Sequence, residues 1–327
     1  MWIDEFLTLM SSSTITLDAI ERAYELKDKN LPNKLYKFRA INSNSISNFE
    51  NDTVWLCSAD KYNDPYECAT TWSTQDVLRQ HSKSNIDQLL GHASLEKHLS
   101  PMEIDAIKAS DDPLVELTKC SIGKHKDISP EKQDELIAAL LKTSNDIASE
   151  NISRMNEFIQ QGTKICSFSS RLDSVVMWGH YANSHTGFAL EYDITTWPRA
   201  DIRRRILHPV IYKHTLFDST KYHLQAITER KNFNNLFGAI AAIHKSPDWS
   251  YENEWRFVLP MGKTFPDQNY AMPIPSALYL GSRISDHDKN TLQAIANKKK
   301  IPVSQMSLSS FEFKLVPHPR GSATANS

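Results

Sequence analysis

Two glutamates separated by one residue give the sequence its clearest candidates for chemistry. The alternating run Trp249–Leu259 (WSYENEWRFVL) predicts a strand on which Glu252, Glu254 and Arg256 share one face. Two acids on one strand face repel each other unless water, a cation or a reaction compensates. Arg256 could simply neutralise them as part of a salt-linked strand, or the two carboxylates could act in catalysis.

Two further strand-like runs carry polar side chains of the same kind. On the run Lys164–Ser169 (KICSFS), the side chains of Ser167 and Ser169 point the same way. The run Leu35–Arg39 (LYKFR) predicts a strand that ends at Arg39, whose guanidinium suits a phosphate or a carboxylate. We expect these runs and the glutamate strand to form the walls of one cleft.

The segment between residues 174 and 193 adds histidine and aromatic side chains. His180 could act as a general acid or base, because histidine titrates near neutral pH. Trp178 and Tyr181 lie three residues apart on one face of a predicted helix, where they could pack in the core or stack on a ring of a ligand. A triad of Ser169, His180 and Asp193 is a third arrangement, but it lacks the GxSxG turn.

No residue spacing in the chain is typical of a metal site, and we predict no metal. A metal-dependent nuclease or hydrolase that uses Asp64, Glu67 and Glu254 stays open as an alternative that rests on acidity alone. Nucleotide-binding motifs of the GxGxxG and GxxxxGK[ST] types are also absent from the sequence.

The composition is that of an ordinary globular protein. The 327 residues are 40% hydrophobic and 23% charged, and the formal net charge of -2 indicates no general attraction to nucleic acid or acidic membranes. The four cysteines show no zinc-like spacing and indicate reduced thiols. No apolar run approaches the ~20 residues that a membrane helix needs. Asp4 and Glu5 stand where a signal peptide is basic, so we expect a cytoplasmic protein.

The elements that must position these residues predict an α+β fold. We expect a mixed or antiparallel sheet of short strands with flanking helices. Residues 1–34 read as a helical lead-in, 35–316 as a single α+β domain and 317–327 as a disordered tail. Residues 74–162 are polar and rich in helix formers, which predicts a helical insertion within that domain that could bind a protein partner.

Five motifs together resemble a bacterial family described as domain of unknown function 2971. They are LYKFR, NDPYE, CSFS, MWGHYANSHTGFALEYD and WSYENEWRF, and the similarity covers about residues 35–282. The family has no established reaction, so the resemblance implies kinship rather than an activity. Proteins that resemble this chain would be expected in bacterial stress responses or phage defence.

The order of the polar residues is also similar to the Arg–Ser–Glu class of ADP-ribosyltransferases. That resemblance implies that Arg39 binds the pyrophosphate of NAD, that Ser167 and Ser169 support the nicotinamide pocket, and that Glu254 holds the nicotinamide ribose. Glu252 would orient the acceptor, which the sequence does not identify. Of the aromatic side chains, that of Tyr181 or Trp178 would stack on nicotinamide.

A non-enzymatic module is the rival interpretation. In that case Arg39, the NDPYE turn and the HYANSH segment would sense a ligand or bind a protein without turnover.

Overall fold

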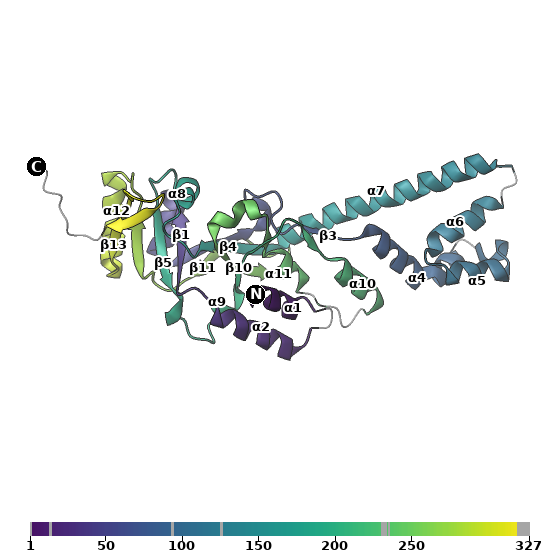
Figure 1. The fold of residues 1–327 in the computed structure, drawn as a ribbon, viewed down its shortest axis with the longest axis horizontal. Coiled ribbons are helices and arrows are strands. Elements are labelled where there is room, and N and C mark those ends of the chain that lie inside the picture. Colours follow the sequence, from purple (N-terminus) through teal and green to yellow (C-terminus); the bar gives the residue numbers. More distant parts are fainter. Residues whose placement is uncertain are drawn as a thin grey trace, which may run out of the picture.

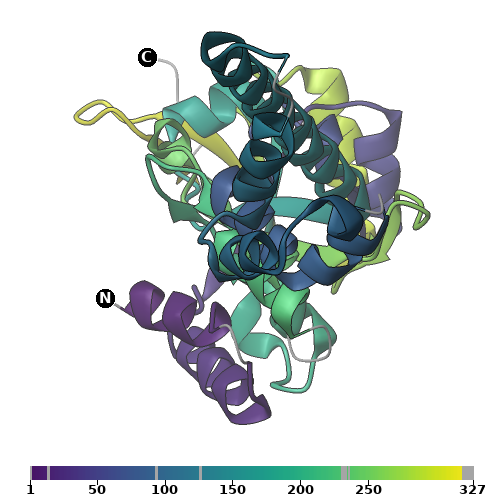
Figure 2. The same ribbon diagram turned by 90° about the vertical axis from the view of Figure 1, so that its right-hand side faces the viewer.

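The computed structural model describes residues 2–12, 15–92, 95–124, 127–229, 234 and 236–318. Its described part contains a mixed sheet of ten strands, with helices at its sides and a long helical arm that projects from it (Figures 1 and 2). The predicted α+β class is confirmed. No helix in the described ranges is both long enough and apolar enough to cross a membrane.

The strands of the main sheet lie in the order β11-β2-β4-β1-β5-β12-β13-β14, and β10 joins β4 to β6. β12 and β13 run parallel, whereas the other pairs are antiparallel. Their bounds are β1 Lys34–Arg39, β2 Thr53–Ser58, β4 Thr163–Ser169, β5 Phe188–Asp193, β6 Leu207–Pro209, β10 Glu254–Pro260, β11 Gln268–Ala271, β12 Ala277–Leu280, β13 Val303–Leu308 and β14 Leu315–His318.

Two small parallel pairs lie beside this sheet: β3 (Thr70–Thr71) with β8 (Phe217–Asp218), and β7 (Ile211–Tyr212) with β9 (His244–Lys245). The helices around the sheet are α1 Trp2–Met10, α2 Leu17–Lys29, α3 Ser43–Glu50, α8 Val175–Tyr181, α9 Ile202–Ile206, α10 Thr220–Thr228, α11 Phe237–Ala241 and α12 Asp286–Lys299. Short 3-10 turns lie at Ala59–Lys61, Ile194–Thr196 and Pro247–Glu252.

The sheet divides at one edge of β4, and this division makes room for the site. One edge of β4 pairs with β10 along its whole length. At its other edge, the first half of β4 pairs with β2 and its end pairs with β1, at Tyr36 opposite Ser169. β1 and β2 therefore diverge beside Ser167, and the backbone carbonyl of Ser167 accepts a hydrogen bond from the Lys37 ammonium, at 2.7 Å, instead of from a neighbouring strand.

The arm corresponds to the helical insertion predicted from residues 74–162. It contains α4 (Thr74–His92), a 3-10 turn at Leu95–His98, α5 (Pro101–Ala109), α6 (Pro113–Gly123) and α7 (Pro130–Gly162). In Figure 1, α7 leads from the far end of the arm back to the sheet, where it continues into β4. Ser100 and Ser129 cap α5 and α7 ahead of a proline, as their sequence signature predicts.

Three local predictions need correction. Residues 249–253 are not part of a strand: Ser246 caps the 3-10 turn Pro247–Glu252, Asn253 takes a left-handed conformation, and β10 begins at Glu254. The run His208–Tyr212 (HPVIY), whose composition predicts a single strand, is split between two strands. The predicted tail begins within β14, which reaches His318, and its remaining residues lie outside the described ranges.

Candidate functional site

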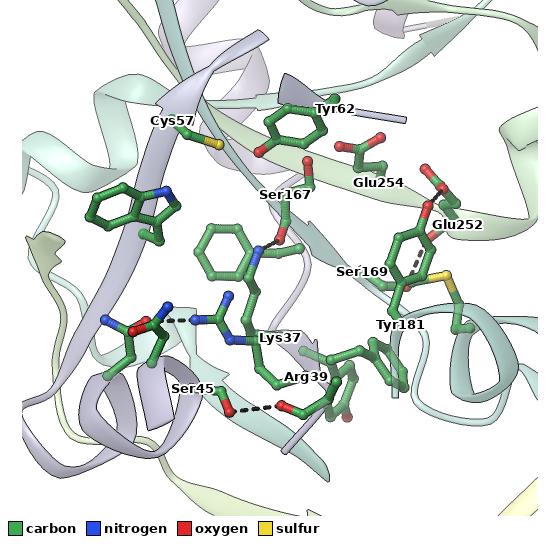
Figure 3. A pocket seen from close by; sticks show the side chains of 18 of the residues that line it. Lys37, Arg39, Ser45, Cys57, Tyr62, Ser167, Ser169, Tyr181, Glu252 and Glu254 are labelled. Atoms are coloured by element: carbon green, nitrogen blue, oxygen red, sulfur yellow. Dashed lines mark hydrogen bonds between the residues drawn. The ribbon is translucent and has the colours of Figure 1, made fainter. Parts of the chain in front are cut away.

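A cavity of about 620 Å³ lies where β1 and β2 diverge. Figure 3 shows the carboxylates of Glu252 and Glu254 on one side of it and the guanidinium of Arg39 on the other. All the lining residues come from outside the arm. They are Tyr36–Ala40, Asn42, Asn44, Ser45, Ser47, Asn48, Trp55, Cys57, Lys61–Asn63, Ser167–Ser169, Met177, Tyr181, Lys245, Glu252, Glu254 and Asn269.

The acidic side of the cavity is a buried cluster of charges around Glu254. The carboxylate of Glu254 accepts hydrogen bonds from Arg256, at 3.0 and 2.7 Å, and from the Lys245 ammonium, at 3.0 Å. Arg256 also donates to the buried carboxylate of Glu67. Burial alone would raise the pKa of Glu254, but Arg256 and Lys245 hold it well below its usual range. Glu254 is therefore a fixed negative charge at the cavity wall.

The pKa of Glu252 is raised rather than lowered, although Glu252 and Glu254 both accept a hydrogen bond from Lys245. Its carboxylate accepts hydrogen bonds from the Lys245 ammonium, at 2.6 Å, and from the Tyr181 hydroxyl. Burial and the neighbouring charge of Glu254 raise the pKa of Glu252 to about 7. Two adjacent carboxyl groups with separated pKa values can divide electrostatic and proton-transfer roles between them. Glu252 is the one that can exchange a proton near neutral pH.

The two serines on β4 have different surroundings. Ser169 donates from Oγ to the backbone carbonyl of Glu252, at 2.6 Å, and so ties β4 to the turn before β10. The Oγ of Ser167 is buried beside Glu254, whose pKa it helps to lower, but it has no well-formed hydrogen bond in the described part of the chain. A buried hydroxyl without a full partner at a cavity wall is a feature that a polar ligand would satisfy.

The basic side of the cavity consists of Lys37 and Arg39 on β1. Arg39 donates to the Oδ1 of Asn48, at 2.6 Å. The Lys37 ammonium lies 5.5 Å from the centre of the Phe168 ring. Within the described ranges, neither cation has a carboxylate within ion-pair distance. Their charge is available to an anionic ligand, and Arg39 retains further N–H donors.

Six of the eight residues predicted for the site line this cavity, namely Arg39, Ser167, Ser169, Tyr181, Glu252 and Glu254. The pairing of β4 with β10 explains part of this convergence, because Glu254 lies opposite Ser169 and Arg256 opposite Ser167. The roles suggested for these residues stay predictions. Glu252 reaches the cavity from the 3-10 turn rather than from the strand face expected for it.

Trp178 and His180 do not line the cavity. Trp178 is fully buried in a hydrophobic cluster. Its ring lies edge-on to the ring of Phe38, with 5.2 Å between the ring centres, and its indole N–H donates to the carbonyl of Leu172. This position matches core packing and corrects its placement among the ligand-stacking residues. His180 is exposed, and its Nδ1 lies 3.1 Å from the hydroxyl of Tyr251.

The catalytic triad and metal-site alternatives are not formed. The Ser169 hydroxyl bonds to a backbone carbonyl, and Asp193 caps a 3-10 turn instead of orienting His180. The guanidinium of Arg256 lies between the carboxylates of Glu67 and Glu254, where a metal would have to bind. The described residues contain no group of three histidine, cysteine or acidic side chains able to hold a metal ion.

Among the contributors to the cavity that sequence reasoning missed are Lys245, Asn48, Trp55 and Asn269. Lys245 lies on the two-residue strand β9, whereas the sequence of residues 232–245 predicts a helix. Trp55 could have been found, because the alternation of TVWLCS places it on the face opposite Val54 and Leu56. The two asparagines carried no comparable signal.

Comparison with known proteins identifies part of the chain. Residues 177–257 match the model of a family described as "Protein of unknown function (DUF2971)". This segment is similar to the DUF2971 family. The family resemblance inferred from the sequence is thereby confirmed, and two of its motifs, Met177–Asp193 and Trp249–Phe257, lie inside the matched range. Searches of curated proteins and of solved structures found no match.

The DUF2971 segment supplies the acidic side of the cavity through Tyr181, Lys245, Glu252 and Glu254. The basic side comes from the preceding part of the chain, on β1. A site therefore forms only when these two parts fold together.

Proposed function

We propose that the cavity binds NAD and cleaves the bond between its nicotinamide and its ribose, as an ADP-ribosyltransferase or an NAD glycohydrolase. The observation that carries the proposal is that Arg39, Ser167 and Glu254, which come from three different strands, line one cavity. The cavity volume of about 620 Å³ is within the usual range for a small-molecule site.

Cleavage of this bond requires a negative charge near the ribose. When the C1′–N bond breaks, its electron pair stays on the nicotinamide nitrogen and positive charge develops on the ribose. Glu254 supports this step because Arg256 and Lys245 keep it ionised and fixed in position. A preorganised charge of this kind stabilises the transition state without having to reorient.

The remaining parts of the site have matching roles. Lys37 and Arg39, which have no carboxylate of the described residues within ion-pair distance, offer positive charge for the pyrophosphate. Water or an acceptor group then attacks the ribose C1′, and Glu252 takes its proton. Glu252 suits this task because its pKa lies near 7. The hydroxyl of Ser167, which has no well-formed hydrogen bond among the described residues, is a further polar group for the nicotinamide end.

The test is release of nicotinamide from NAD, measured by chromatography with purified protein. We expect Glu254→Gln to lower kcat by about 100-fold or more, as does the loss of a preorganised charge elsewhere. Arg39→Gln should chiefly raise KM, and it leaves the buried charge cluster intact. Glu150→Gln on the exposed surface of α7 serves as the matched control.

Absence of both nicotinamide release and NAD binding by folded wild-type protein would overturn the proposal. Binding of NAD without release would favour the sensing module instead. Such a result has a structural basis, because two cations already hydrogen-bond the carboxylate of Glu254. If release is observed, depletion of cellular NAD on expression would support an effector role in bacterial stress or phage defence.

A further inference from the structure

Trp55 is an exposed tryptophan on the wall of the cavity. It has 42% of its surface accessible, whereas its strand neighbours Val54 and Leu56 are buried in the core. A tryptophan side chain offers a large flat apolar surface, and its exposure in a cavity forgoes much of the burial it could gain. A planar ring stacked on Trp55 would recover that burial.

Asn269 lies directly across the strand pair from Trp55. The register of β2 with β11 places these two residues opposite each other, on the side of the pair that faces away from the core. The Oδ1 of Asn269 accepts a hydrogen bond from Asn48, at 2.7 Å, which orients the amide. This leaves the Nδ2 donors and one Oδ1 lone pair of Asn269 available. Such an amide can pair with N7 and N6 of adenine.

Asn48 links Asn269 to Arg39 on the basic side of the cavity. Asn48 accepts from Arg39 through Oδ1 and donates through Nδ2 to Asn269 and to Thr53. Arg39, Asn48 and Asn269 thus form one hydrogen-bonded row that ends beside Trp55. A nucleotide needs three kinds of partner, and they are adjacent here. Arg39 offers a cation for a phosphate, Asn269 an amide for the edge of the base, and Trp55 a ring for its face.

We propose that β2, β11 and the end of β1 form an adenine-nucleotide subsite. The base stacks on Trp55, its edge pairs with Asn269, and its phosphates lie against Arg39 and Lys37. This subsite rests on the proposed function only in that cleavage of NAD would take place at the acidic end of the same cavity. Binding of the adenine nucleotide itself follows from Trp55, Asn269 and Arg39.

The binding test uses ADP and the full-length protein in isothermal titration calorimetry. We expect Trp55→Ala to weaken ADP binding by about 10- to 100-fold, the size usual for loss of one stacked base, and Trp55→Phe to restore most of it. Asn269→Ala should weaken ADP more than CDP, whose base lacks the adenine edge. Phe311→Ala, which removes an exposed aromatic ring outside the cavity, is the matched control.

The turnover test compares NAD with nicotinamide mononucleotide, which lacks the adenosine half. We expect Trp55→Ala to raise KM for NAD at least tenfold more than KM for nicotinamide mononucleotide. If Trp55→Ala loses ADP binding but the wild-type protein releases no nicotinamide, the subsite is retained and the proposed reaction is rejected. Nicotinamide release combined with equal ADP affinity in wild type and Trp55→Ala would reject the subsite and retain the reaction. If wild-type protein binds no ADP, the subsite is rejected in either case.

Discussion

Glu252 and Glu254 show how two identical side chains acquire different properties from their surroundings. Glu254 receives hydrogen bonds from two cations, and its pKa falls. Glu252 accepts hydrogen bonds from one cation, Lys245, and from the neutral hydroxyl of Tyr181. Burial and the negative charge of Glu254 raise the pKa of Glu252 to about 7. The sequence shows that both acids lie close to Arg256. It does not show the separation of their pKa values, because Lys245 and Tyr181 come from other elements.

The raised pKa of Glu252 predicts a pH-dependent activity. Below pH 7 Glu252 holds a proton and cannot accept another, so kcat/KM for nicotinamide release should rise with pH through about 7 and then level off. Glu252→Gln should be slow at every pH and should lose this rise. The measurement is kcat/KM between pH 5 and 9, and a wild-type profile without a rise near pH 7 would contradict the role given to Glu252.

Among the elements, the sequence predicts best those that have a strong local signal. Thr16 ahead of the run Leu17–Lys29 predicts a capped helix, and α2 has these bounds and this cap. The alternation of apolar residues also predicts β1 and β2. The alternation at residues 249–253 was misleading, because Ser246 followed by proline starts a 3-10 turn there. A period of two cannot distinguish a strand from the turn that leads into it.

Packing of β5 against β1 positions the end of the strand that carries Arg39. Gly187 precedes β5, and a Cβ on it would lie 2.2 Å from the backbone oxygen of Arg39. Gly187→Ala should therefore lower the free energy of unfolding by about 1–3 kcal/mol and shift Arg39. Gly179 in α8 has nothing within 4 Å of such a Cβ, so Gly179→Ala should raise stability by about 0.5–1 kcal/mol.

Urea unfolding of both glycine variants provides the measurement. Equal stability of the Gly187→Ala variant and the wild type would mean that the close approach of β5 to Arg39 is not rigid.

At the scale of the whole molecule, the outer part of the arm has a hydrophobic core separate from those of the sheet, whereas Ile159 at the base of α7 packs with residues of β4 and β10. The arm buries its own small cluster, Ile86, Leu90, Leu99, Ile107 and Leu117, while the sheet has a much larger one. The polarity and helix signals of residues 74–162 predict helices, and α4, α5, α6 and α7 lie there. These signals could not predict that the arm contributes no lining to the cavity, because that depends on the direction in which α7 leaves the sheet.

The small core of the arm predicts that its tip opens independently of the sheet. Regions with few buried apolar contacts exchange their amide hydrogens through local opening, whereas the central strands require nearly global unfolding. Amides of α5 and α6 should therefore exchange faster than those of β4 and β10 in hydrogen–deuterium exchange mass spectrometry. Ile107→Ala, which removes a fully buried side chain, should destabilise the tip by about 2–5 kcal/mol and speed exchange there. In Ile107→Ala, exchange in β4 and β10 should stay unchanged. Met102→Ala is the control, because the Met102 side chain is 83% exposed on the same helix, and this substitution should leave exchange at the tip unchanged. Equal acceleration of the tip and the central strands in Ile107→Ala would show instead that the arm and the sheet unfold as one unit.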